Sequence, residues 1–147
     1  MKILIAAIGK AKPSPELQLY ADYVKRLPWK ITCQEFDVRP ASKEKEAEKL
    51  LAVCVGYSRI IALDEAGKQF TSPEFAKQIS GFQQQGHSSF AFIIGGADGL
   101  SDSVRKSAHL IWSLGNLTWP HMLVRGLLAE QLYRSYSILN NHPYHRN

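Results

Sequence analysis

Short apolar runs alternate along this chain with segments of helical period, and this alternation restricts the fold more than any other feature. The helical segments open on residues suited to an N-cap, such as Ser14 before Pro15 and Glu16. Strands that alternate with helices predict an α/β fold with a mainly parallel sheet. The expected strands are 2–8, 31–38, 58–63, 89–94 and 110–114, and the expected helices, with their caps, are 14–27, 42–55, 72–86, 101–109 and 121–139.

The expected strands are nearly continuous in apolar residues, which indicates that helices cover both faces of the sheet. No linker, repeat or low-complexity segment interrupts the chain, so residues 1–147 are interpreted as one domain. No apolar run approaches the roughly 20 residues that span a bilayer. The first nine residues resemble a first strand more than a signal peptide, so a cytoplasmic location is expected.

The chain carries a formal net charge of +5, which favours an anionic partner such as nucleic acid. Lysines and glutamates alternate over residues 43–49, a pattern typical of a solvated helix face. Cys33 and Cys54 are isolated, and the His142 and His145 pair has no further ligands at metal spacing. Neither a metal site nor a disulfide framework is therefore expected.

Three loops follow expected strands and should meet at the carboxyl edge of the sheet, where ligands bind in open α/β folds. They are 63–68, 95–100 and 114–120. The glycine turn 95–99 is neither the dinucleotide fingerprint nor a P-loop, which argues against kinases and NTPases. The turn is equally compatible with a tight strand-to-helix connection that binds nothing. Asp64 and Glu65 are adjacent and would face opposite ways in a strand, so a carboxylate pair is not expected.

The loop 114–119 combines apolar side chains with glycine, asparagine and threonine and carries no charge. Apolar walls and free backbone amides suit a flat, mostly uncharged ring such as adenine. A buried crossover with its own packing is the alternative interpretation of this loop. The following helix places its leucines at helical spacing for the core, which leaves Arg125, Gln131 and Arg134 for solvent, a phosphate or a partner subunit.

The final residues are rich in side chains that donate hydrogen bonds, stack on bases or pair with phosphate. With the earlier segments they make the sequence resemble the RlmH-type enzymes of the SPOUT methyltransferase superfamily over essentially the whole chain. The resemblance is carried by Ile60–Asp64 with Gly67 and Lys68, Ile94–Gly96 with Gly99–Ser101, Leu117 and Thr118 with Pro120 and His121, Leu123–Arg125, Ala129–Arg134 and Asn141–Arg146.

The resemblance implies an α/β domain with a C-terminal trefoil knot, a homodimer, and methylation of N3 of a pseudouridine in large-subunit (23S) ribosomal RNA on the assembled ribosome. The knot loops would bind S-adenosylmethionine, and the tail of one subunit would help to complete a site near the cofactor of the other. By this resemblance the cofactor-binding residues are Leu63, Gly95, Leu114, Gly115, Asn116, Leu117, Thr118 and Trp119, and the catalytic residues are His142, Tyr144 and Arg146.

The imide nitrogen of a pseudouridine attacks well only after it loses its proton, so a base or an anion-stabilising donor is required. Arg146 and a tail histidine are expected to stabilise the developing charge, Tyr144 to contact the base, and Arg125 and Arg134 to be weaker candidates for phosphate contact. Two residues depart from the family pattern: Trp119 replaces Leu or Phe, and Gly126 replaces a bulkier residue.

Three other functions stay open at this point. A non-enzymatic RNA-binding or ribosome-assembly protein would fit the net charge, but would not need the apolar loop 114–120. A nucleotide-binding enzyme of flavodoxin-like or Rossmann type lacks its fingerprint here. A SPOUT enzyme that acts on another RNA, such as tRNA, would share every motif named above.

Overall fold

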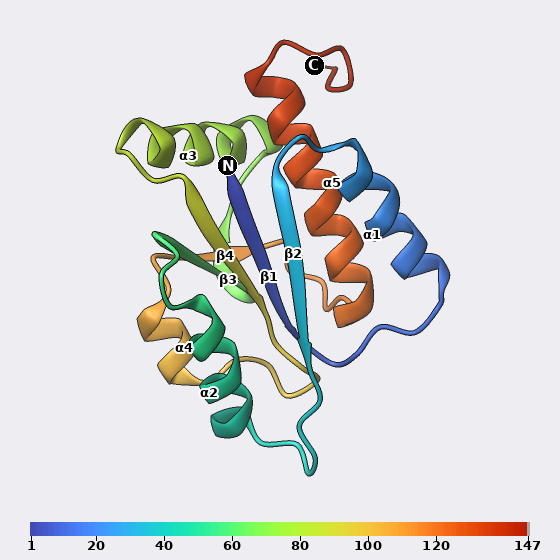
Figure 1. Ribbon diagram of the computed structural model, residues 1–147, viewed down its shortest axis with the longest axis vertical. Helices are drawn as coiled ribbons and strands as arrows, with labels where there is room; N and C mark the ends of the chain where they lie inside the picture. Colours follow the sequence, from blue (N-terminus) through green and yellow to red (C-terminus); the bar gives the residue numbers. More distant parts are fainter. Residues whose placement is uncertain (147) are drawn as a thin grey trace.

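Five strands form one sheet at the centre of the molecule, in the order β2-β1-β4-β3-β5 (Figure 1). The structure is a computed structural model that describes residues 1–146; Asn147, the last residue of the expected domain, lies outside the described residues. The strands are β1 Lys2–Ile8, β2 Lys30–Phe36, β3 Arg59–Gln69, β4 Ser89–Ile94 and β5 Leu110–Ser113. Each pair of neighbouring strands is parallel, so the carboxyl ends lie along one edge and the predicted parallel α/β sheet is confirmed.

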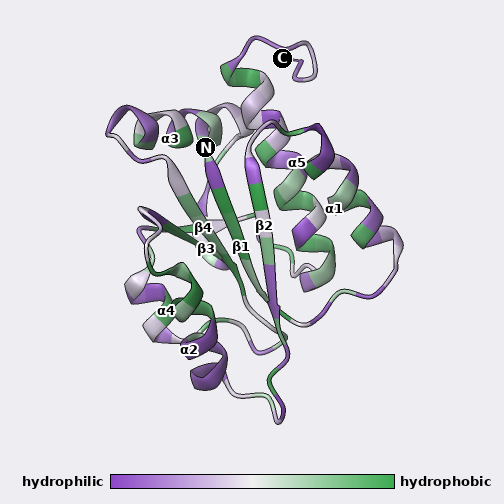
Figure 2. Ribbon diagram, in the orientation of Figure 1, coloured by the Kyte–Doolittle hydropathy of each residue, from purple (hydrophilic) through white to green (hydrophobic). Residues whose placement is uncertain are grey.

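Helices cover both faces of the sheet, as the apolar strands predict (Figure 1). The helices are α1 Pro15–Arg26, α2 Lys43–Cys54, α3 Ser72–Gln84, α4 Asp102–Ser107 and α5 His121–Leu139. Alternate residues of β1 divide the core: Ile3 and Ile5 pack with residues of α3 and α5, whereas Leu4 packs with residues of α2 and α4. This is the two-residue period of a strand buried on both faces. Figure 2 shows the hydrophobic stretch of β1.

Local capping chemistry sets most of the helix starts. Ser14, Ser42 and Ser101 are N-caps whose side chains accept a hydrogen bond from a backbone N–H in the first turn, as predicted. The predicted cap Ser72 is wrong by one residue. Thr71 is the cap, because its side chain and that of Glu74 form a reciprocal capping box that Ser72 could not form at this spacing.

The end of β3 is the main departure from the predicted elements. The sequence predicts a strand to Leu63 and then a loop to Lys68, but β3 continues to Gln69. It pairs with β5 at residues 61–63 and again at Lys68 and Gln69, and its register shifts between Leu63 and Lys68, where the backbone is irregular. Gly67 allows the close approach, since a Cβ there would lie 2.7 Å from the carbonyl oxygen of Ile111. The other element boundaries lie within two residues of those predicted.

Helices α1 and α5 lie side by side on one face of the sheet (Figure 1). Gly126 of α5 faces Leu19 of α1, and a Cβ at residue 126 would lie 2.8 Å from Leu19 Cδ2. The glycine that departs from the family pattern therefore permits close packing of these two helices. Ser137, in the last turn of α5, is buried and donates a hydrogen bond to the carbonyl of Tyr133.

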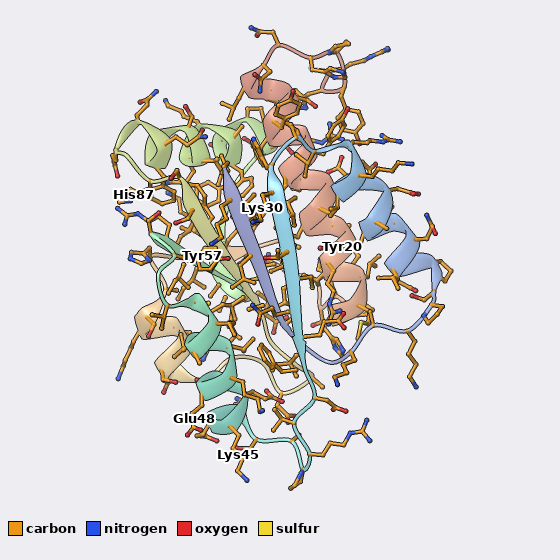
Figure 3. The ribbon with its side chains drawn as sticks, in the orientation of Figure 1. Tyr20, Lys30, Lys45, Glu48, Tyr57 and His87 are labelled. Atoms are coloured by element: carbon orange, nitrogen blue, oxygen red, sulfur yellow. The ribbon has the colours of Figure 1, made fainter. Side chains whose placement is uncertain are left out.

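The charged run 43–49 lies on α2 and is mostly solvated, as predicted; Lys45 and Glu48 are exposed on this helix (Figure 3). Glu46 is the exception and is buried, with 6% of its surface exposed. None of the described helices is both long and apolar enough to cross a membrane. The trefoil knot implied by the resemblance stays a prediction.

Candidate functional site at the carboxyl edge of the sheet

A cavity of about 670 Å³ lies at the carboxyl edge of the sheet, where the three predicted loops meet. Residues 63–65 at the bulge of β3, residues 95–100 of the glycine turn and most of the segment 114–121 line it. Ile94 of β4, Arg105 of α4, Trp112 of β5 and Val124 of α5 complete the lining. Its volume falls in the range of sites for nucleoside-sized ligands.

The glycine turn has a shape that larger residues would disturb. Gly96 and Gly99 are joined by a bridge of backbone hydrogen bonds, and Gly99 adopts a φ of +79°. A Cβ on Gly95 would lie 2.8 Å from Leu100 Cδ2 and 3.1 Å from the carbonyl oxygen of Gly99. The turn therefore brings its backbone to the cavity wall without side chains at these positions.

The loop after β5 supplies an apolar wall that is open to solvent. Gly115 has a φ of +113°, and the hydroxyl of Ser113 accepts a hydrogen bond from the Gly115 N–H at 3.1 Å, which fixes the start of the loop. Leu117 is 67% exposed and Trp119 is 38% exposed, although both line the cavity. Exposed apolar side chains around a cavity are typical of a surface that a ligand or a partner covers.

Trp112 lines the cavity, and its ring is held in place by a second aromatic ring. Its ring stacks on that of Phe75 at a centroid distance of 3.8 Å, and 3% of its surface is exposed. This stacking ties the cavity to the core between the sheet and α3.

The structure brings seven of the eight predicted cofactor-binding residues to this cavity: Leu63, Gly95, Leu114, Gly115, Leu117, Thr118 and Trp119. Asn116 is not among the lining residues. Its side-chain oxygen accepts a hydrogen bond from Gln69 Nε2 at 2.7 Å, so it joins the loop to the end of β3. Cofactor binding by these residues stays a prediction.

Asp64 and Glu65 both line the cavity, and their carboxylates accept hydrogen bonds from different segments of the chain. The register of β3 shifts between Leu63 and Lys68, and the expectation that the two side chains face opposite ways stays a prediction. Arg105 donates two hydrogen bonds to Asp64 Oδ2, at 3.1 and 2.7 Å. Thr118 donates to Glu65 Oε2 at 3.1 Å and so links the loop after β5 to β3.

Sequence reasoning did not single out Arg105, Trp112, Asp98 or Val124 for the site. Asp98 lies within the predicted loop 95–100, so its place at the site could have been predicted from the sequence. Nothing in the sequence pointed to Arg105, because an arginine in the last turn of a short helix is usually solvated.

Arg125 is buried and its guanidinium is bonded to partners inside the protein, out of reach of an RNA phosphate, so its expected role in phosphate contact is wrong. Its guanidinium pairs with the Glu35 carboxylate of β2 and donates to the carbonyls of Ile8 and Gly9 at the end of β1. The side chain is 4% exposed. Arg125 therefore fixes the first turns of α5, and with them the loop that lines the cavity, to the carboxyl edge of the sheet.

The predicted catalytic tail lies at the opposite end of α5 from the cavity. His121 begins this helix at the cavity, and the 19 residues of α5 span about 28 Å. The tail then lies at the end of the molecule that holds the N-terminus (Figure 1). His142, Tyr144 and Arg146 are thus near one another in the chain, but they do not line the cavity of their own chain.

Tyr144 is held by side chains of α1 and α5. Its hydroxyl is 2.9 Å from the hydroxyl of Tyr23 and donates to Glu130 Oε1 at 3.0 Å. The Arg134 guanidinium lies 4.8 Å from the ring centroid, and Arg134 also pairs with Glu130. Burial, followed by the hydrogen bonds to Tyr23 and Glu130, raises the pKa of Tyr144 well above its usual value, so the phenol stays protonated.

The other two predicted tail residues are more accessible. His142 packs edge-on against Tyr133 at 6.2 Å between ring centroids and, like Arg146, is exposed. The Tyr144 backbone N–H donates to His142 Nδ1 at 3.2 Å. The tail is therefore an ordered turn with Tyr144 directed inward and two basic side chains at its surface.

Comparison with known proteins gives concordant matches over nearly the whole chain. A family model described as "Predicted SPOUT methyltransferase" matches residues 1–145. Proteins named ribosomal RNA large subunit methyltransferase H are similar in sequence: that of Paramagnetospirillum magneticum is 47% identical over 151 residues, and that of Polynucleobacter asymbioticus is 42% identical over 147 residues. In both cases 99% of each chain is covered.

Solved structures share the fold at low sequence identity. A probable methylase family protein from Haemophilus influenzae superposes with a TM-score of 0.60 at 13% identity, covering 99% of this chain and 70% of that one. The SpoU methyltransferase AviRb from Streptomyces viridochromogenes, solved in complex with AdoMet, gives a TM-score of 0.50 at 12% identity, covering 92% of this chain and 60% of that one.

Proposed function

The chain belongs to the SPOUT methyltransferases, and on this premise we propose that it transfers a methyl group from S-adenosylmethionine to large-subunit ribosomal RNA. The observation that carries the proposal is the convergence of three loops on one cavity, in a chain that is 47% identical to a ribosomal RNA large subunit methyltransferase H. A basic chain of net charge +5 fits an RNA substrate.

The chemistry of the cavity fits the methyl donor. Leu114, Leu117 and Trp112 offer apolar walls for the adenine ring, and the glycine turn offers close backbone approach. Glu65 and Asp98 offer carboxylates to a positively charged molecule. When bound there, S-adenosylmethionine supplies a methyl group on a sulfonium, and the product left after transfer is the neutral thioether S-adenosylhomocysteine.

The acceptor that we propose is N3 of a pseudouridine in 23S ribosomal RNA on the assembled ribosome, as the resemblance implies. The protein then has two main tasks: to align this nitrogen with the methyl group and to favour loss of the imide proton. Exposed His142 and Arg146 are the tail residues that we assign to the target nucleotide. Tyr144 was expected to contact the base, but we assign it to holding the tail in position, because its hydroxyl is already engaged by Tyr23 and Glu130.

A second copy of the chain accounts for the separation of the tail from the cavity. The tail follows the far end of α5, a helix about 28 Å long that begins at the cavity, and His142, Tyr144 and Arg146 do not line the cavity of their own subunit. We therefore propose a homodimer in which each site combines the cavity of one subunit with the tail of the other, and an enzyme that acts in the cytoplasm, where ribosomes are assembled.

The decisive test is a methylation assay with S-adenosylmethionine on whole ribosomes, large subunits, naked 23S rRNA and tRNA. Nucleosides are then identified by mass. The proposal expects N3-methylpseudouridine from ribosomal substrates and none from tRNA. Methylation of tRNA alone would move the enzyme to another RNA, and absence of S-adenosylmethionine binding in calorimetry would favour a non-enzymatic RNA-binding protein.

A further inference from the structure

The cavity carries a charge opposite to that of the chain. The described residues of its lining include three acids, Asp64, Glu65 and Asp98, one arginine, Arg105, and one histidine, His121, which is counted as neutral here as in the net charge of the chain. Three carboxylates against one guanidinium leave the cavity with an excess of negative charge, although the whole chain has a net charge of +5. Clefts lined by one sign of charge concentrate the electrostatic field and attract ligands of the opposite sign.

The positive charge of Arg105 is already used within the site. Its guanidinium donates to Asp64 at 2.7 Å and lies 3.5 Å from Asp102 on the same helix. The side chain of Asp64 is 7% exposed, so this pair is partly shielded from water. Arg105 therefore neutralises Asp64, and Glu65 and Asp98 remain as the carboxylates that a bound molecule meets.

Two separate observations describe the surroundings of Glu65 and Asp98. The Glu65 carboxylate accepts a hydrogen bond from the neutral hydroxyl of Thr118 at 3.1 Å. On the other side of the glycine turn lies the carboxylate of buried Glu46. One of its oxygens is 3.3 Å from the position that a Cβ would take if Gly96 carried one. Burial and then the negative charge of Asp98 raise the pKa of Glu46, so a second carboxyl group lies within electrostatic reach of Asp98 on this side of the turn.

Given the proposed function, we propose that Glu65 and Asp98 determine specificity by charge, so that the cavity holds the cationic methyl donor more tightly than the neutral thioether product. Donor and product share the adenosine and the amino acid end, and differ in one methyl group and one positive charge on sulfur. Apolar contacts and backbone hydrogen bonds hold both equally well, and a carboxylate attracts the ammonium group of the amino acid end in both. Only the donor adds the sulfonium charge, so carboxylates near the sulfur favour the donor. Weaker binding of the product then promotes its release after transfer.

The same carboxylates disfavour ligands that carry phosphate groups. An anionic phosphate would meet uncompensated negative charge, and the short helix α4 after the glycine turn has its own N-terminal cap in Ser101. The negative charge of the cavity thus distinguishes it from the phosphate-binding sites of flavodoxin-like and Rossmann enzymes.

Calorimetry with two ligands tests the proposal. Dissociation constants for S-adenosylmethionine and S-adenosylhomocysteine are measured on the full chain, on Glu65→Gln, on Asp98→Asn and on the double variant. Each single variant should weaken binding of the methyl donor by about two- to tenfold and leave that of the product within about twofold. Added salt should reduce the preference of the unmodified protein for the donor and have little effect on that of the double variant.

The matched control is Glu48→Gln, which removes one exposed negative charge from α2 outside the cavity (Figure 3). It should change neither dissociation constant. The conservative variants Glu65→Asp and Asp98→Glu should retain the preference for the donor. Equal weakening of both ligands, or an unchanged ratio in the double variant, would overturn the charge proposal. Failure of the unmodified protein to bind the donor would instead overturn the proposed function.

Discussion

Arg125 shows how a single buried charge connects the core to the site. It pairs with Glu35 and binds the carbonyl groups at the end of β1, so it holds the start of α5 against the carboxyl edge of the sheet. The sequence could not reveal this role. An arginine on a helix is usually solvated, and Glu35 lies ninety residues away in the chain.

Arg125→Ala should strongly destabilise the fold. The change leaves the Glu35 carboxylate and two backbone carbonyls without their partner, which costs about 3 kcal/mol of unfolding free energy. Urea denaturation measures this loss. The control Arg39→Ala breaks an exposed pair with Asp37 and should change stability by less than about 0.5 kcal/mol. Similar effects of the two variants would contradict the assigned role of Arg125.

Glu46 gives a pH-dependent prediction. Its folded pKa is raised, chiefly by burial and then by Asp98, so the fold favours its protonated form. The stability that it contributes is fully present below its unfolded pKa and is lost as the pH rises through the folded pKa. Glu46→Gln should therefore stabilise the protein by about 0.5 kcal/mol at pH 7.5, with a smaller gain at pH 4.5.

Urea denaturation at the two pH values measures the effect, with Glu48→Gln on the exposed face of α2 as control. The control should show no difference that depends on pH. A loss of stability at pH 7.5 in Glu46→Gln would mean that the buried carboxylate is stabilised by its surroundings, contrary to our account.

At the scale of elements, local chemistry predicted most of the fold. Serine caps and apolar runs located nearly all helices and strands, because both signals act over a few residues. The extension of β3 to Gln69 was missed because it depends on pairing with β5, more than forty residues further along. The buried position of Gly126 was missed for the same kind of reason, since its neighbour is Leu19 of α1.

Two glycines in helices test the packing of α1 on α5. A Cβ on Gly126 would lie 2.8 Å from Leu19 Cδ2, whereas a Cβ on Gly81 of α3 would meet nothing within 4 Å. Gly81→Ala should stabilise the protein by about 0.5–1 kcal/mol through helix propensity. Gly126→Ala should instead destabilise it by about 1 kcal/mol, because the helices must move apart. Thermal and urea denaturation give both values, and equal stabilisation by the two changes would show that the helices pack loosely.

At the scale of the whole molecule, the sequence predicted that three loops converge but not how the strands are ordered. Convergence follows from parallel strands, whose carboxyl ends share one edge. The order β2-β1-β4-β3-β5 depends on long-range pairing that no local pattern encodes. The separation of tail and cavity likewise follows from the position of α5, which only the structure supplies.

The exposed tail arginine should act in turnover and not in cofactor binding. Arg146 is distant from the cavity of its own chain, so Arg146→Ala should lower methyl transfer to ribosomal RNA by about 100-fold or more. The dissociation constant for S-adenosylmethionine should stay within about twofold. Single-turnover kinetics and calorimetry measure the two quantities. Full turnover in Arg146→Ala would remove this residue from the mechanism.

Subunit mixing tests the composite site most directly. One variant, Thr118→Trp, fills the cavity from an exposed lining position, and the other, Arg146→Ala, disables the tail. Each alone should be nearly inactive. After denaturation and joint refolding at equal amounts, half of the dimers combine the two variants and hold one intact site, so about one quarter of the original turnover should return. If the mixture stays as inactive as its components while both fold and dimerise, the cavity and tail of different subunits do not form one site.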